Sequence, residues 1–109
     1  MAINLQKISN DICKKYKVET IPIKTTNRQA KGPGVYMTEK IKGGKINIPL
    51  YIMIFEWDFV KKYKDEWIYT LSHELSHHIV NVKYGSLQHN RIHSKITNEI
   101  VNYLINLLV

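Results

Sequence analysis

The sequence is poor in cysteine, in arginine and in long apolar runs, and each shortage excludes a class of protein. Cys13 is the only cysteine, which rules out an intrachain disulfide and a cysteine-based zinc site; we expect it to fill space in the core. No apolar run approaches the roughly 18 residues that a membrane span needs. Residues 1–12 also lack the apolar segment and cleavage site of a signal peptide. We therefore expect a cytoplasmic protein with no membrane partner.

The positive charge of the chain is large but dispersed. Sixteen Lys and Arg residues against nine Asp and Glu give a net charge of +7, and Arg28 and Arg91 are the only arginines. Proteins that bind nucleic acid usually gather such charge on one face or along one helix, whereas here no basic run exceeds two residues. We interpret the charge as a solvated surface, so nucleic acid is not the partner we expect. With 109 residues, residues 1–109 are predicted to form a single domain around one core.

Periodicity along the chain predicts an α+β fold with about three strands in a small antiparallel or mixed sheet. Apolar residues at helical spacing predict an N-terminal helix over 3–16 that backs the sheet. Residues 18–25 alternate but contain Pro22, which suits an edge or broken strand. Two strand-like runs, 35–41 and 45–49, flank Lys42-Gly43-Gly44 and predict a hairpin.

Three helices are predicted after the hairpin. A short one spans about 55–64, and a longer one spans 67–84 and ends at Gly85, a residue type typical of helix ends. Ser86 is then expected to cap a final helix over about 87–108. The last helix is very apolar, and Ile105 and Val109 fall off its core-facing stripe, which suggests self-association.

The helix at 67–84 carries the pattern H-E-x-x-H at His73, Glu74 and His77. A helix turns 100° per residue, so the two histidines lie about 40° apart on one face and can direct two imidazole nitrogens at one metal ion. The apolar residues of the segment lie on the opposite face and seat the helix on a core. Zinc suits imidazole, and a catalytic zinc site uses three protein ligands and keeps a fourth position for water. The pattern therefore predicts a metal site in which Glu74 acts as general base.

The third ligand must come from elsewhere, and Glu99, His89 and His93 are the candidates. Glu99 lies at the margin of the apolar stripe of the last helix, where a carboxylate is costly unless it meets a cation. His89 and His93 also project inward if that helix has begun by residue 89. The metzincin pattern is absent, because Val80 and Lys83 occupy the places of its glycine and third histidine.

The motif HELSH, followed on a second helix by Asn98-Glu99, resembles the gluzincin metallopeptidases, and over nearly the whole of this short chain it most resembles the minigluzincins. The resemblance implies a zincin-like fold with a backing helix, an active-site helix and a C-terminal glutamate helix. It also implies one zinc ion per chain on His73, His77 and Glu99, with Glu74 as catalytic base. Peptide substrates and latency through self-association or a blocked cleft are further implications.

Some positions depart from that pattern. Tyr103 stands where larger gluzincins often place an acidic residue that supports the first histidine, and Asn102 could take over that support. If His89 were the third ligand, the chain would instead resemble SprT-type zincins acting at nucleic acid, although His93 occupies the aromatic position of their motif.

We expect a zinc metalloendopeptidase in which Glu74 takes a proton from the attacking water and returns it to the leaving amine. Tyr84, His93 and Tyr103 are candidates to stabilise the oxyanion, and Asn98 is a candidate for support around the ligands. The alternative without catalysis is a metal-stabilised interaction protein, which needs the two histidines but not the glutamate between them.

Overall fold

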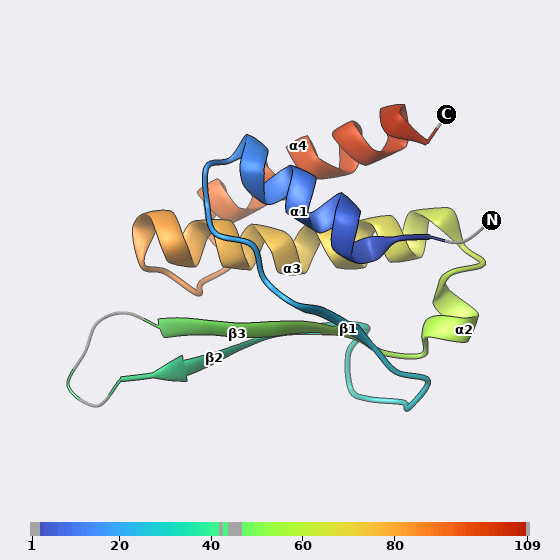
Figure 1. The fold of residues 1–109 in the computed structure, drawn as a ribbon, viewed down its shortest axis with the longest axis horizontal. Helices are drawn as coiled ribbons and strands as arrows, with labels where there is room; N and C mark the ends of the chain where they lie inside the picture. The colour runs from blue at the N-terminus through green and yellow to red at the C-terminus, as the bar shows by residue number, and fades with distance from the viewer. Residues whose placement is uncertain (1–2, 42, 44–46, 109) are drawn as a thin grey trace.

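The protein is described by a computed structural model that covers residues 3–41, 43 and 47–108. Its elements run in the order α1(Leu5–Lys15), β1(Ile23–Thr25), β2(Gly34–Lys40), β3(Asn47–Ile54), α2(Trp57–Val60), α3(Lys64–Tyr84) and α4(Arg91–Leu107) (Figure 1). The predicted α+β class with a small three-stranded sheet is confirmed. No helix within the described ranges is long and apolar enough to cross a membrane.

The helix ends follow from local chemistry. Asn4 caps α1 by accepting a hydrogen bond from the Lys7 amide at 3.0 Å, and Asn90 does the same for α4. Acidic residues occupy the first turn of α3, where they favour the positive end of the helix dipole. Gly85 ends α3 with a φ of 68°, a left-handed conformation that glycine adopts without strain.

The sheet is mixed, with strand order β1-β3-β2. Strand β1 runs parallel to β3, and β2 runs antiparallel to it, so β2 forms one edge and β1 the other. The predicted hairpin is confirmed, but its second strand does not end at Pro49. It continues to Ile54, and the pairing shifts register between Met37 and Thr38, opposite Pro49. A shift at this place accommodates a residue that has no amide hydrogen to donate.

Other boundaries also differ from the sequence prediction. The short helix after the sheet has only four residues. The last helix begins at Arg91 rather than at 87, and Asn90, not Ser86, caps it; residues 85–90 therefore form a loop. Two residues of the predicted hairpin turn, Lys42 and Gly44, lie outside the described residues, as do Lys45 and Ile46 at the start of the predicted second strand, and Val109.

The core lies between the sheet and helices α1, α3 and α4, which lie on one side of it (Figure 1). Helix α3 contributes more fully buried apolar side chains than any other element, including Leu71, Leu75 and Ile79, and β3 contributes Ile52 and Ile54. Cys13 is buried as expected. Helix α3 therefore packs against the sheet on one side and against α4 on another, which holds its histidine-bearing face in place.

Candidate metal centre

His73 and His77 lie one turn apart on α3, and their ring centroids are 4.9 Å apart. His77 is buried and His73 is partly buried. Burial disfavours the imidazolium form, and charge on the neighbouring histidines adds to this effect, so the pKa of His73 is lowered and that of His77 falls to about 3. Both rings are therefore neutral near pH 7, the form in which imidazole binds a metal.

The third imidazole at this position belongs to His89, in the loop between α3 and α4. Its Nε2 lies 3.0 Å from His77 Nε2 and 3.1 Å from His73 Nε2. A neutral imidazole nitrogen carries at most one hydrogen, so His89 Nε2 can donate to only one of these two neighbours. Three nitrogens that converge in this way are better satisfied by one cation than by hydrogen bonds among themselves.

The spacing of the three nitrogens fits a small divalent ion. Zinc binds imidazole nitrogen at about 2.0–2.1 Å in tetrahedral sites, which places two ligand nitrogens about 3.3–3.4 Å apart. The two measured separations, 3.0 and 3.1 Å, are a few tenths of an ångström shorter. A small outward movement of the rings would accommodate the ion.

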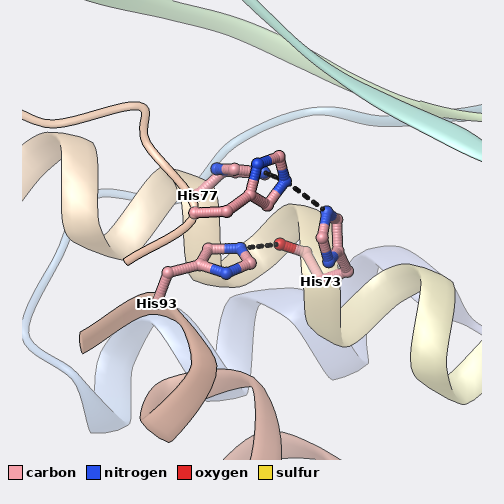
Figure 2. Close-up of side chains that lie close together, drawn as sticks. His73, His77 and His93 are labelled. Carbon is pink, nitrogen blue, oxygen red and sulfur yellow. Dashed lines mark hydrogen bonds between the residues drawn. The ribbon is translucent and has the colours of Figure 1, made fainter. Parts of the chain in front are cut away.

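A fourth histidine, His93, lies beside these three. Ligand nitrogens of all four histidines lie within 4.8 Å of one another, so the group could hold a metal ion. Figure 2 shows His93 reaching from α4 to the backbone of α3, where its Nε2 lies 3.1 Å from the carbonyl oxygen of His73. Donation by Nε2 leaves Nδ1 as the lone-pair nitrogen of a neutral ring. His93 therefore links the first turn of α4 to the backbone of α3.

Glu99 is not part of this group, in contrast to the ligand set that the minigluzincin resemblance implies. Its side chain is exposed and accepts a hydrogen bond from the Tyr16 hydroxyl, with an oxygen–oxygen distance of 2.7 Å. The reason is the rotation of α4, whose buried face carries His93, Ile96 and Ile100. With these residues turned inward, Glu99 points toward the end of α1. The structure thus brings the alternative candidate, His89, to the histidine pair.

The other predicted site residues lie away from the three histidines. Tyr84 ends α3 and is 59% exposed, and Asn98 is exposed on α4. Tyr103 lines a cleft between α1 and α4 together with Glu99, and the Lys15 ammonium lies 4.6 Å from its ring centroid. Among the described residues, neither tyrosine lines the cavity in front of the histidines.

That cavity has a volume of about 280 Å³ and is lined by His73, Glu74, His77, His89, Leu87 and the first residues of β2. Of the four described histidines in the group, His93 alone does not line it. Three imidazoles therefore face open space, as an ion with a free coordination position requires.

Glu74 borders the same cavity and is 7% exposed. Burial raises the pKa of its carboxyl group from 4.5 to about 7. The backbone of Gly34 in β2 lies close against it: a Cβ on this glycine would sit 3.3 Å from Glu74 Oε2 and 2.8 Å from Thr70 Cγ2. The glycine lets the edge strand approach the candidate base.

Tyr36 is a site residue that the sequence did not reveal. Its ring lies parallel to that of His77, with 6.5 Å between centroids and 3° between planes. Its hydroxyl oxygen lies 3.0 Å from His78 Nδ1 and accepts a hydrogen bond from Asn81. His78 Nε2 in turn lies 2.7 Å from the carbonyl oxygen of Glu19. This network joins β2 to α3 and holds Tyr36 beside the ligand, and no local pattern links residue 36 to residues 77–81.

No protein-family model, no curated protein and no solved structure matches this chain. Over the residues that the structure describes, the fold and the site define a small α+β protein with four helices, a three-stranded mixed sheet and a four-histidine cluster that could bind a metal ion.

Proposed function

We propose that this protein is a zinc-dependent hydrolase of peptide bonds, with His73, His77 and His89 as metal ligands and Glu74 as general base. One observation carries the proposal. The Nε2 atom of His89 lies at hydrogen-bond distance from the Nε2 atoms of both His73 and His77. Glu74, which is buried on the same helix as His73 and His77, faces the same cavity as the three histidines. A structural role for the histidines alone gives no reason for a carboxyl group at this place.

Zinc is the favoured ion because neutral imidazoles suit it and three protein ligands leave one position for substrate or water. A zinc ion held here would lower the pKa of water toward neutrality and polarise a peptide carbonyl. A histidine in the third place departs from the minigluzincin pattern and agrees with the SprT-type alternative.

Glu74 has the properties of a general base for this reaction. A base works best when its pKa lies near the operating pH, and burial brings the pKa of Glu74 to about 7. Its carboxylate would accept a proton from the attacking water and later give it to the departing amine. The adjacent cation would lower this pKa and keep the carboxylate ionised between turnovers.

The free edge of β2 favours an extended peptide as substrate. Gly34, Val35 and Tyr36 line the cavity, and β2 is the outer strand of the described sheet next to α3. An edge strand offers main-chain amide and carbonyl groups to which a peptide can add as a further strand. Such a peptide would run past Glu74 and the three histidines.

The ligand set is tested by comparing His89→Ala with Glu99→Ala. We expect wild type and Glu99→Ala to retain one zinc per chain through dialysis against a weak chelator, and His89→Ala to lose it, because His89 and not Glu99 lies beside the histidine pair. Metal analysis by mass spectrometry measures this. If His89→Ala keeps its zinc while Glu99→Ala loses it, the ligand set implied by the minigluzincin resemblance is restored.

The reaction is tested with Glu74→Gln, which keeps the shape of the side chain but cannot take a proton. We expect hydrolysis of casein or a peptide library to fall by about 10²–10⁴-fold, with unchanged zinc content. Equal cleavage by Glu74→Gln and wild type at equal zinc content would rule out Glu74 as the base.

The nearness of His93 favours a second candidate, a metal-stabilised protein without catalysis. Its Nδ1 could complete a site of four imidazoles. Four protein ligands leave no coordination position open, which is typical of structural zinc. Such a protein would bind zinc, unfold or dissociate on chelation, and cut no peptide. His93→Ala would then reduce zinc affinity as strongly as His89→Ala, whereas the catalytic site predicts a smaller loss.

The position of His89 also keeps the SprT-type alternative, a module acting at nucleic acid. DNA binding whose affinity falls steeply with salt would favour it.

A further inference from the structure

A hollow of about 710 Å³ lies along α3 on the N-terminal side of the candidate ligands. Its walls are mostly apolar and come from α2, α3 and α4. They include Val60, Ile68, Thr70, Val101 and Ile105. Neither the metal ligands nor Glu74 account for an apolar hollow at this place, so it calls for its own explanation.

This apolar hollow is linked to the metal cavity by a third hollow that shares lining residues with both. A smaller hollow of about 260 Å³ lies between them. It shares Pro33, Tyr69 and Thr70 with the apolar hollow, and it shares Gly34, His73 and Glu74 with the metal cavity. The three hollows therefore adjoin one another, from the candidate ligands past the candidate base to the apolar walls, and are together termed the groove.

We propose that this hollow, which we term the apolar subsite, holds the side chain of a residue flanking the scissile bond and gives the protein a preference for leucine or phenylalanine there. The inference rests on the proposed function. A peptide lying along the edge of β2 would place its cleaved carbonyl beside Glu74 and the three histidines. A neighbouring side chain could then extend through the connecting hollow to Val101 and Ile105.

The charges around the subsite refine this preference. Asp65 and Glu66 also line it, and both are exposed. They would repel an acidic side chain. Their attraction for lysine would be weakened by solvent, whereas the apolar walls lose contact with water when an aliphatic or aromatic group enters. We therefore expect large apolar residues to be preferred, small ones to be weaker and acidic ones to be weakest.

The direct test uses internally quenched peptides that differ at one position, scanned through the residues on both sides of the cleaved bond. At the position served by the subsite, we expect kcat/KM with leucine or phenylalanine to exceed that with alanine by about tenfold or more. Equal rates for leucine and alanine at every position would overturn the proposal. A preference for lysine would overturn it as well and assign specificity to Asp65 and Glu66.

Ile105→Trp fills the subsite without touching a ligand or the base. Val82→Trp is the matched control, because Val82 is a β-branched residue on α3 of similar exposure, 44% against 38% for Ile105, and does not line the described groove. We expect Ile105→Trp to lower kcat/KM for the leucine peptide about tenfold while sparing the alanine peptide and the zinc content. Equal effects of the two tryptophans would contradict the proposal.

Ile105→Glu serves if Ile105→Trp does not fold, because a partly exposed helical position tolerates a charged residue better than a bulky one. It should reduce the leucine preference in the same way, since a carboxylate in the wall makes apolar occupancy unfavourable. An unchanged preference would contradict the proposal.

A binding experiment separates failure of the subsite from failure of the proposed hydrolysis. Two peptide hydroxamates, one with an isobutyl side chain and one with hydrogen, are titrated calorimetrically into the zinc-loaded protein. Binding at least about tenfold tighter for the isobutyl compound, lost in Ile105→Trp, would support the subsite even if no peptide is cut. Equal affinity, or no binding of either, would overturn it.

Discussion

Gly34 lies where strand β2 packs closely against the candidate base. A Cβ at this position would lie 2.8 Å from Thr70 Cγ2 and 3.3 Å from Glu74 Oε2, so Gly34→Ala must push β2 or α3 outward. Overpacking of this kind costs about 1–3 kcal/mol of folding free energy. We expect the variant to unfold at lower urea concentration. Its rate of peptide hydrolysis should fall by more than the loss of folded protein explains, because Glu74 is displaced.

Gly32→Ala is the control for that prediction. The nearest atom to a Cβ there is the Gly34 carbonyl oxygen at 3.9 Å, an ordinary contact. It should leave both the urea midpoint and the hydrolysis rate close to those of the wild type. Equal behaviour of the two alanine variants would show that the close approach at Gly34 does not matter.

Among the elements, the loop between α3 and α4 brings the third candidate ligand, His89, to His73 and His77. Its exit is fixed by Asn90, whose side chain accepts a hydrogen bond from the His93 amide at 2.9 Å. Asn90→Ala should cost about 1 kcal/mol of folding free energy. It should also weaken zinc binding, since the loop that positions His89 loses its anchor. Urea unfolding and competition with a fluorescent zinc chelator measure the two effects.

Asn4→Ala separates these effects, because Asn4 caps α1 in the same way but far from the histidines in sequence. A similar loss of stability with unchanged zinc affinity is expected. A drop in zinc affinity as large as that in Asn90→Ala would mean that the loop has no particular role.

For the whole molecule, the buried histidines predict a loss of stability in acid. The pKa values of His73, His77, His78 and His93 are all lowered by burial, so the unfolded chain binds more protons than the folded protein below pH 6.5. The contribution of these neutral histidines to the free energy of unfolding is therefore fully present above that pH and is lost progressively as the pH falls below it. Each such histidine contributes at most about 1.4 kcal/mol per pH unit.

Glu74 acts in the opposite direction between about pH 4.5 and 7, because its raised pKa makes the folded protein bind the extra proton. One carboxyl group offsets only part of the effect of four imidazoles. We expect the metal-free protein to have a lower urea midpoint at pH 5.5 than at pH 7.5, and Glu74→Gln to show a larger difference. Identical midpoints at the two pH values would contradict neutral, buried histidines.

The pair His73 and His77, the glutamate between them and the helix that carries them could be predicted from the sequence, because each depends on spacing within a single helix. The same holds for α1 and for Gly85 at the end of α3, where the signals are a few residues apart. Pro49 misled the strand prediction, since the register shift that accommodates it, with Leu50 as the extra residue of β3, arises only from the pairing of β3 with β2.

Which candidate for the third ligand lies beside His73 and His77 was decided only by tertiary structure. A helical wheel places Glu99 and His93 relative to each other, but it does not give the rotation of α4 about its own axis against α3. Packing of Ile96, Ile100 and Leu104 into the core sets that rotation and turns Glu99 toward Tyr16. His89 reaches the histidine pair because residues 85–90 form a loop rather than the start of a helix. Sequence alone thus determined that His73, His77 and Glu74 lie together on one helix, because their spacing is local. Packing between distant segments determined that His89, and not Glu99, lies beside them.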